Sequence, residues 1–268
     1  SRRGVELTEA GSRFFPHAVS ILRQAEEAIA SARSGTAEPR GKVVFGIPHS
    51  VSNALALPLL RAVRQQLPKV QLELTEELTG NLSKQLRTGQ IHLAVLFDDG
   101  HLSEFAATPL LSEQMYLIEP AREGKKRRAN VPFKEVLAMP LILPASPHGV
   151  RPIIDNAAAR AGLAPPVVEA DISSISILRT TLLAGLGRTL LPLMPFHHEI
   201  STGLLSASKV NNPPLERTLV LCASGHIPAS SASQAVEAVT LSLVGELCQT
   251  GHWQGAQLIP RGASLSPP

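Results

Sequence analysis

A short polar stretch after a buried apolar run has the residue types of a ligand-binding turn. Lys42 to Ile47 is rich in β-branched and aromatic residues, as in a strand buried on both faces of a parallel sheet. Pro48 ends this run, and small polar residues follow where a helix should begin: His49, Ser50, Ser52 and Asn53. We expect Asn53 to cap that helix, leaving amide hydrogens and the helix dipole to favour a carboxylate or another acidic group.

Ligands of open α/β sheets bind outside the carboxyl ends of the strands, where Pro48 to Asn53 would lie. This stretch is therefore the leading candidate for a binding site. An ordinary strand-to-helix turn, in which the hydroxyls only cap the helix, would need the same residues. The residues alone leave both interpretations open.

Other chemically suggestive residues are less informative. The adjacent His197, His198 and Glu199 point in different directions in regular structure, and no third ligand is in view, so we predict no metal site. The basic run Lys125 to Arg128 has no interleaved aromatic residues and is more typical of a solvated loop than of a nucleic-acid patch. No GxSxG, HExxH, Walker or GxGxxG signature occurs. We predict neither an enzyme nor a cofactor.

The composition sets broad limits on the protein. Its 268 residues suffice for two modest domains, and the 44% hydrophobic content can bury cores. A formal charge of +3 is too small for nucleic-acid binding over the whole surface. Cys222 and Cys248 form neither a disulfide framework nor a zinc motif, which favours a reducing cytoplasm. We see no membrane-spanning run, and the first residues do not resemble a signal peptide.

The elements that must position the polar turn begin with a long helix. We expect Thr8 to cap it and residues 12–34 to form it. Its apolar residues step by three and four, with the period of a heptad that needs a partner helix: Phe15, Ala18, Leu22, Ala25, Ile29 and Ala32. The alternative is a helix that lies on its own domain. Gly35 and Pro39 then predict a hinge over residues 35–40.

Two α/β lobes should follow the hinge. Strands and helices alternate from residue 41 to residue 97, which predicts a parallel sheet with right-handed crossovers. A second alternating series follows, and we expect strands at 204–210 and 218–223 to complete its sheet. The predicted division is residues 41–110 plus 226–250 for lobe I, 111–225 for lobe II, and a disordered tail over 251–268 that is rich in Gly, Ser and Pro.

Five segments, in this order, resemble the LysR-type transcriptional regulators over nearly the whole length: RRGVELTEAG, RGKVVFGIPHS, LPLLRAVRQQLPKVQLELTEE, LRTGQIHLAV and LLAGLGRTLLP. Ser50 to Leu60 looks most like the nitrogen-assimilation-control branch of that family. Two residues depart from the family pattern. His92 stands where an acidic residue is usual, and Arg188 stands where an apolar residue is usual.

The resemblance implies an amino-terminal winged helix-turn-helix, a dimerising linker helix and a two-lobed effector domain similar to periplasmic solute-binding proteins. Residues 1–11 match the wing, so the resemblance assigns DNA contacts to Arg2, Arg3 and Thr8. Nothing in the chain matches the recognition helix that would enter the major groove. We therefore expect this chain to lack sequence-specific affinity for DNA.

The resemblance also implies an effector site between the lobes, built from strand ends and helix starts. Carried onto this sequence, the site comprises His49, Ser50, Ser52, Thr79, Phe97, Ser146, His148 and Ser174, with Ser173 beside it. Converging hydroxyl and amide donors suit a small polar or anionic metabolite. Any one of these residues taken singly could equally be a helix cap.

The sequence thus predicts the effector-binding and dimerisation portion of a transcription regulator. Its expected partners are promoter DNA, through a helix-turn-helix mostly absent from the chain, a small-molecule effector and further copies in a homodimer or homotetramer. Two alternatives remain open: a free-standing solute-binding protein, and a truncated regulator that poisons full-length partners. The heptad helix argues against the first, since a transport receptor does not need it.

Overall fold

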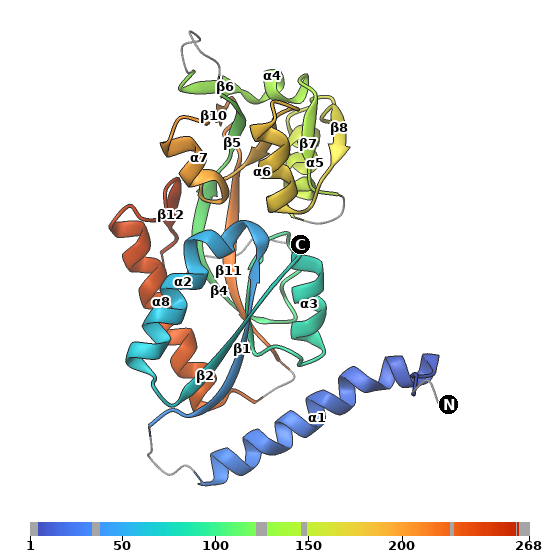
Figure 1. Ribbon diagram of the computed structural model, residues 1–268, viewed down its shortest axis with the longest axis vertical. Helices are drawn as coiled ribbons and strands as arrows, with labels where there is room; N and C mark the ends of the chain where they lie inside the picture. The colour runs from blue at the N-terminus through green and yellow to red at the C-terminus, as the bar shows by residue number, and fades with distance from the viewer. Residues whose placement is uncertain are drawn as a thin grey trace.

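The computed structural model describes residues 5–33, 38–121, 128–145, 149–225, 228–260 and 262. Two lobes lie one above the other along its long axis, and the helix α1 (Glu9–Arg33) extends beside the lower lobe (Figure 1). Arg2, Arg3, Ser146, His148 and Lys125 to Arg127 fall outside the described residues. Among the described residues, no helix is long and apolar enough to cross a membrane.

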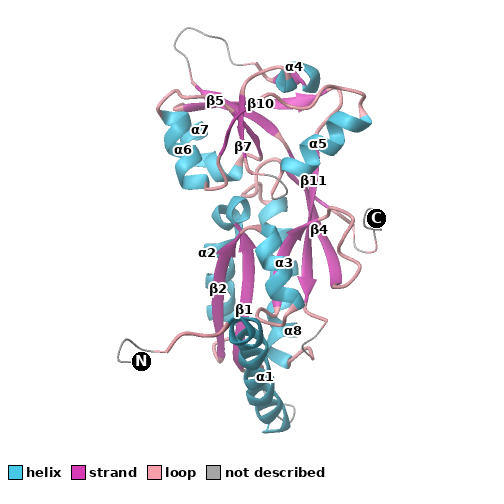
Figure 2. Ribbon diagram, turned by 90° about the vertical axis from the view of Figure 1, so that its right-hand side faces the viewer, coloured by secondary structure: helices cyan, strands magenta, loops and turns pink. Residues whose placement is uncertain are grey.

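Lobe I, the lower one, contains a six-stranded sheet in the order β12-β4-β11-β3-β1-β2. Its first half is the predicted strand–helix alternation: β1 (Gly41–Pro48), α2 (His49–Gln66), β2 (Val70–Glu77), α3 (Thr79–Arg87) and β3 (Leu93–Phe97). β1 pairs in parallel with both β2 and β3. This arrangement brings the carboxyl ends of three strands to the edge of the lobe that faces lobe II (Figure 2).

The other half of this sheet corrects the predicted lobe boundaries. β4 (Ala106–Gln114) and β11 (Glu216–Ala223) pair antiparallel with each other, and β11 also pairs with β3. The prediction that the strand over residues 218–223 completes the sheet of lobe II is therefore wrong. Its buried residues, Leu219 to Cys222, fill the core of lobe I instead. Lobe II is the segment between β4 and β11, and these two strands carry the chain into it and back.

The carboxyl-terminal segment also belongs to lobe I. α8 (Ser231–Gln249) packs against α2 and β1. The predicted disorder is wrong for residues 251–260, because Trp253 is 2% exposed and β12 (Ala256–Leu258) pairs antiparallel with β4. A local composition rich in Gly, Ser and Pro concealed the single large side chain that anchors this segment to the core.

Lobe II combines a four-stranded sheet, β6-β10-β5-β9, with the parallel pair β7-β8. The strands are β5 (Tyr116–Pro120), β6 (Asn130–Pro132), β7 (Leu141–Leu143), β8 (Val168–Asp171), β9 (Thr189–Leu191) and β10 (Leu205–Asn211). The helices are α4 (Phe133–Leu137), α5 (Arg151–Arg160), α6 (Ile175–Leu183), the 3-10 turn η1 (Met194–Phe196) and α7 (His197–Ser201). β5 pairs antiparallel with β9 and β10, while β10 pairs in parallel with β6, so this sheet is mixed.

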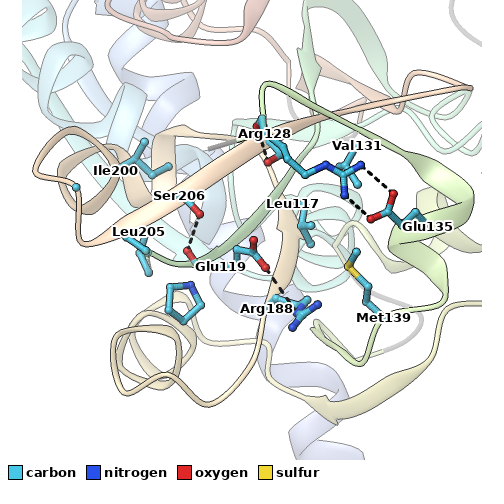
Figure 3. Close-up of a pocket in the computed structure, with 14 residues that line it drawn as sticks. Leu117, Glu119, Arg128, Val131, Glu135, Met139, Arg188, Ile200, Leu205 and Ser206 are labelled. Carbon is cyan, nitrogen blue, oxygen red and sulfur yellow. Dashed lines mark hydrogen bonds and ion pairs between the residues drawn. The ribbon is translucent and has the colours of Figure 1, made fainter. Parts of the chain in front are cut away.

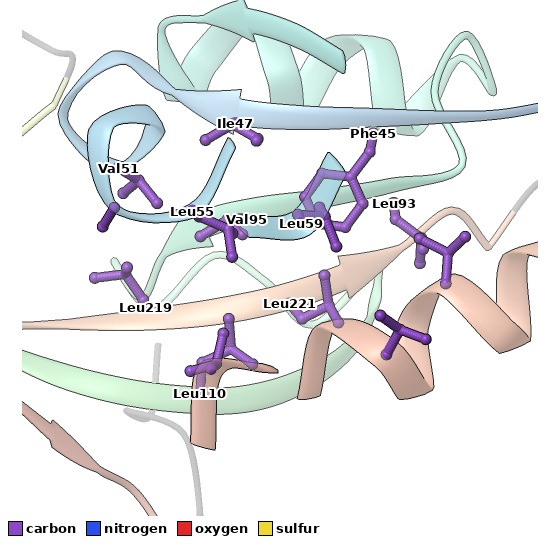
Figure 4. Close-up of a cluster of buried hydrophobic side chains, with 14 of the residues drawn as sticks. Phe45, Ile47, Val51, Leu55, Leu59, Leu93, Val95, Leu110, Leu219 and Leu221 are labelled. Atoms are coloured by element: carbon purple, nitrogen blue, oxygen red, sulfur yellow. The ribbon is translucent and has the colours of Figure 1, made fainter. Parts of the chain in front are cut away.

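Apolar spacing explains how lobe I packs. Val51, Leu55 and Leu59 recur every four residues on α2 and face the sheet. They share one core cluster with Phe45 of β1 (Figure 4). On the opposite face, α3 lies so close to β1 that a Cβ at Gly46 would come within 2.6 Å of a methyl carbon of Leu82. Helices thus cover both faces of the parallel half of the sheet, and this packing fixes the position of α2.

The long helix α1 keeps its apolar side exposed. The side chains of Phe15, Leu22 and Ile29 are 56%, 67% and 53% exposed, and Ala25 is also exposed. Thr8 caps the helix as predicted, since its Oγ1 accepts a hydrogen bond from the Gly11 amide at 3.0 Å. The described residues of the lobes therefore leave four heptad residues of α1 exposed, contrary to the alternative of a helix lying on its own domain: Phe15, Leu22, Ala25 and Ile29.

Candidate functional site

A small cavity lies between the lobes, where the first turns of α2 and α3 face lobe II. Its volume is about 30 Å³, enough for one or two water molecules. Lobe I contributes four of the predicted effector residues to its lining: His49, Ser50, Thr79 and Phe97. Lobe II contributes Pro144, Gly149, Val150, Ser173, Ile175 and Leu191. Thr79, Phe97 and Gly149 also line a larger adjoining hollow of about 390 Å³, so the two form one interlobe cleft.

Two predicted residues do not line the small cavity. The Ser52 hydroxyl donates to Glu76 Oε1 and to the His49 carbonyl, both at 3.0 Å. Ser174 caps α6, its Oγ accepting from the Ile177 amide at 3.4 Å. The roles of Ser146 and His148 lie outside the described residues. Sequence reasoning missed the apolar half of the lining, because Leu78, Val150, Ile175 and Leu191 look like ordinary core residues in the sequence.

Asn53 does not cap α2, contrary to the prediction. The helix begins at His49 with Pro48 at its N-cap, where φ is −65°, and no side chain caps it. Proline supplies this φ at no cost, so the helix starts five residues earlier than a capping Asn53 would allow. Asn53 lies in the second turn, and its Nδ2 donates to the Pro195 carbonyl of lobe II at 3.1 Å. It therefore links the two lobes.

Behind Ser50 lies a buried polar network that the sequence did not predict. Arg217 Nη1 donates to Ser50 Oγ at 2.9 Å, and Arg217 Nε donates to Glu113 Oε2 at 2.7 Å. The guanidinium carbon lies 4.1 Å from the centre of the Phe97 ring. Trp253 Nε1 donates to the other Glu113 oxygen at 2.7 Å. Burial lowers the pKa of Arg217 from its usual value, and Glu113 opposes that shift.

The rim of the cleft carries further charged groups. His49 Nδ1 lies 3.0 Å from Glu76 Oε1, which also accepts from Ser52. Glu77 lines the cavity and accepts a hydrogen bond from Asn81 Nδ2 at 3.0 Å. Neither carboxylate lies in the first turn of α2, which has no acidic residue. The helix start at Ser50 is thus the donor-rich side of the cleft.

A second hollow of about 290 Å³ lies on lobe II, away from the interlobe cleft (Figure 3). Apolar side chains such as Leu117 and Met139 share its lining with two ion pairs. Arg128 Nη2 donates to Glu135 at 2.9 Å, and Arg188 Nε lies 3.9 Å from Glu119. Hydrogen bonding to Arg128 lowers the pKa of Glu135. Both arginines have a carboxylate partner, so this hollow is less suited to an anion than the interlobe cleft.

Neither cysteine has the environment of a reactive thiol. Both Cys222 and Cys248 are free. Burial raises the pKa of Cys222 to about 12 and that of Cys248 to about 11.

Glu199, next to His197 and His198, is buried, and its carboxylate lies 3.0 Å from Arg179 Nε. Among the described residues, no cluster of three possible ligands could hold a metal ion.

Comparison with known proteins decides the family. Residues 36–242 match the family model of the LysR substrate binding domain. The chain belongs to the LysR family of transcriptional regulators. It is 31% identical over 245 residues to the nitrogen assimilation regulatory protein Nac of Klebsiella aerogenes, covering 91% of this chain and 79% of that protein. The family relationship therefore rests on most of the chain, and it marks a regulator and not an enzyme.

Two further comparisons extend the similarity. The transcriptional regulator BbuR of Bordetella bronchiseptica is 27% identical over 263 residues, which cover 98% of this chain and 80% of that protein. A full-length OxyR variant from Pseudomonas aeruginosa has the same fold, with a TM-score of 0.72 at 19% identity over 99% of this chain and 82% of that one. This likeness, at so low an identity, concerns the fold alone.

Proposed function

We propose that this LysR-type chain senses a small polar or anionic metabolite that binds between the lobes at the first turn of α2. The observation that carries this proposal is the convergence of His49, Ser50, Thr79 and Phe97 with lobe II residues on one cleft. The Ser50 hydroxyl and the uncapped amides at the start of α2 supply donors there. Acceptor oxygens of a carboxylate or a similar group complement such donors.

Lobe movement couples binding to regulation in this proposal. The part of the cleft beside Ser50 has a volume of only about 30 Å³, too small for a metabolite, so the lobes must move apart for a ligand to reach the Ser50 hydroxyl. The bond from Asn53 to the Pro195 carbonyl crosses between the lobes and favours the closed arrangement. An effector shifts the balance between arrangements only through its different affinity for each of them.

The helix α1 supplies dimerisation in this proposal. Its exposed heptad residues, among them Leu22 and Ile29, would pack on α1 of a second copy. The two DNA-binding heads of a regulator would then respond to the geometry of the paired lobes. Promoter recognition itself would need the helix-turn-helix, of which residues 1–11 match only the wing. Exposed apolar positions on α1 also favour a regulator over a free-standing solute-binding protein.

The site can be tested with a single substitution. Small carboxylates, inorganic anions and neutral polar metabolites are screened by thermal shift, and each hit is titrated by calorimetry. Ser50→Arg should abolish binding, because its side chain fills the cavity next to Arg217, while circular dichroism stays that of a folded protein. Ser52→Arg is the matched control, since Ser52 lies on the same turn but does not line the small cavity. Unchanged binding to the Ser50→Arg protein would remove the assignment.

A further inference from the structure

The buried network behind the cleft joins parts of the chain that are far apart in sequence. Glu113 and Arg217 lie directly opposite each other on β4 and β11, close to where both strands leave lobe I for lobe II. Their side chains are 1% and 0% exposed. Ser50 comes from the start of α2, and Trp253 comes from the segment after α8. The hydrogen bonds that lead from Ser50 to Trp253 pass through this one ion pair.

Stability alone does not account for a charge pair in this position. Removing two charges from water costs several kcal/mol per ion, and well-packed apolar residues in their place are often as stable. Apolar residues are also buried on the same two strands, among them Leu111 and Leu219, which lie opposite each other. The pair does, however, fix the orientation of two neighbouring side chains. Arg217 fixes Ser50 on one side, and Glu113 fixes the Trp253 indole on the other.

The hydrogen-bond pattern also fixes which atom Ser50 offers to a ligand. Its oxygen accepts from Arg217 Nη1, so its hydroxyl hydrogen must point elsewhere. Within the described part of the chain, that hydrogen has no acceptor, and Ser50 lines the cavity. Glu113 binds the opposite edge of the guanidinium, so the positive end of the ion pair points toward Ser50. A hydroxyl polarised in this way is a strengthened donor for an acceptor oxygen.

We propose that Arg217 and Glu113 are positioning residues that hold Ser50 as a donor to the effector. They also transmit the binding of the effector from Ser50 to Trp253. This inference rests on the proposed function, since it concerns the same cleft. A ligand oxygen that draws on Ser50 changes its bond to Arg217. The guanidinium can adjust only against Glu113, whose second oxygen holds the indole N–H. Trp253 lies just before β12, so a change at Trp253 would alter the position of this carboxyl-terminal strand.

The single tryptophan allows a test without any effector. Emission of Trp253 is recorded in the full 268-residue chain for the wild type, Ser50→Ala and Ser52→Ala. Removing the Ser50 oxygen leaves Arg217 without that acceptor, so we expect the emission to shift to longer wavelength and acrylamide quenching to increase. Ser52→Ala should leave both unchanged, because the Ser52 hydroxyl bonds only to His49 and Glu76. Identical spectra for the two variants would overturn the proposal.

A double-mutant comparison shows whether the path runs through Glu113. Glu113→Gln keeps the shape of the side chain but removes its charge, and it should shift the emission by itself. Ser50→Ala should then add nothing to the Glu113→Gln protein, since the connection is already broken. Independent, additive shifts would contradict a shared path. If Ser50→Ala does not fold, Ser50→Thr keeps an oxygen at this position and should give the wild-type spectrum, and a shifted spectrum in Ser50→Thr would count against the proposal.

The failure of this relay can be told apart from the failure of the effector site. If Ser50→Ala leaves Trp253 unchanged while Ser50→Arg abolishes metabolite binding, the relay is wrong and the effector site stands. If Ser50→Arg binds the metabolite normally, the effector site is wrong, and the network serves structure alone. With any metabolite found by calorimetry, Glu113→Gln should bind it more weakly, and at saturation it should lose the emission change that the wild type shows. An emission change retained in that variant would refute the relay.

Discussion

The Asn53 side chain of lobe I and the Arg179 side chain of lobe II donate to the same backbone oxygen, the Pro195 carbonyl, at 3.1 Å and 2.6 Å. Asn53 lies on α2, whose first turn lines the interlobe cleft, while Pro195 belongs to η1. This shared acceptor makes η1 a contact point between the lobes. Its strength should therefore influence how easily the cleft opens.

Replacing Asn53 should loosen the lobes without unfolding them. Asn53→Leu removes the donor while Arg179 still satisfies the Pro195 carbonyl, so we expect a loss of roughly 0.5–1.5 kcal/mol in the free energy of unfolding. Hydrogen exchange should become faster around η1 and the start of α2. Asn81→Leu is the control, because Asn81 bonds to Glu77 within lobe I. Equal exchange at η1 in the wild type and the Asn53 variant would contradict the contact.

If α1 mediates dimerisation, a charged residue on its apolar face should lower the molecular mass of the protein in solution. Leu22→Glu puts a charge into the proposed helix–helix contact, so sedimentation velocity should show a monomer where the wild type shows a dimer or tetramer. Val167→Glu is the control, since Val167 is similarly exposed but lies on lobe II. A wild-type chain that stays monomeric at tens of micromolar (about the range for a weak coiled coil) would rule out α1 as the contact.

The two thiols should be unreactive in the native protein. With pKa values of about 12 for Cys222 and about 11 for Cys248, the thiolate fraction at pH 7 is about 10⁻⁴ or less. Iodoacetamide at pH 8 should label both cysteines much faster in urea than in buffer, as mass spectrometry can measure. Rapid native labelling of Cys222 would contradict its burial.

The raised pKa values of the two thiols predict that the stability of the fold falls at high pH. The folded pKa of each thiol lies above the unfolded value of 9.0, so the folded state holds its thiol protons more tightly. This contribution is fully present below pH 9 and is lost as the pH rises through 11 to 12. Cys222→Ala should reduce the loss of stability over that window, as urea titrations at pH 8 and pH 10.5 would show. An unchanged pH dependence would exclude Cys222 as its source.

Two glycine substitutions should act in opposite directions. A Cβ at Gly46 would lie 2.6 Å from Leu82 and 2.9 Å from Ile91, so Gly46→Ala should cost about 1–3 kcal/mol through overpacking. A Cβ at Gly245, within α8, would meet no atom within 4 Å, so Gly245→Ala should stabilise the protein by up to about 1 kcal/mol. Chemical denaturation of both variants measures the difference. A neutral Gly46→Ala would show that α3 can move away from β1.

The parts of the fold that depend on local pattern were predictable. Apolar runs, glycine stops and a four-residue helical spacing identified the strand–helix alternation from β1 to β3 and the helix α1. Sheet membership was not, because it depends on partners far along the chain. β11 has the same apolar pattern whether it joins lobe I or lobe II, and only its pairing with β3 decides.

The site shows the same division. Ser50 was expected at the cleft because it follows a parallel strand, where ligands of such sheets bind, and Phe97 because of the family resemblance; both line the interlobe cavity. Arg217 and Glu113 are 104 residues apart, and each looks like an ordinary surface charge in the sequence. No spacing rule connects them, and their meeting depends on the register between β4 and β11. Trp253 was hidden for the same reason, inside a segment whose composition favours disorder.

The burial of Trp253 also limits how the gene can be engineered. A deletion that stops at the end of α8 would leave a hole in the lower core and an unpaired edge on β4, even though only loop-like sequence had been removed. Reporter fusions and affinity tags should therefore be joined after Leu258. Shortened versions that misfold would otherwise be mistaken for regulators that have lost their signal.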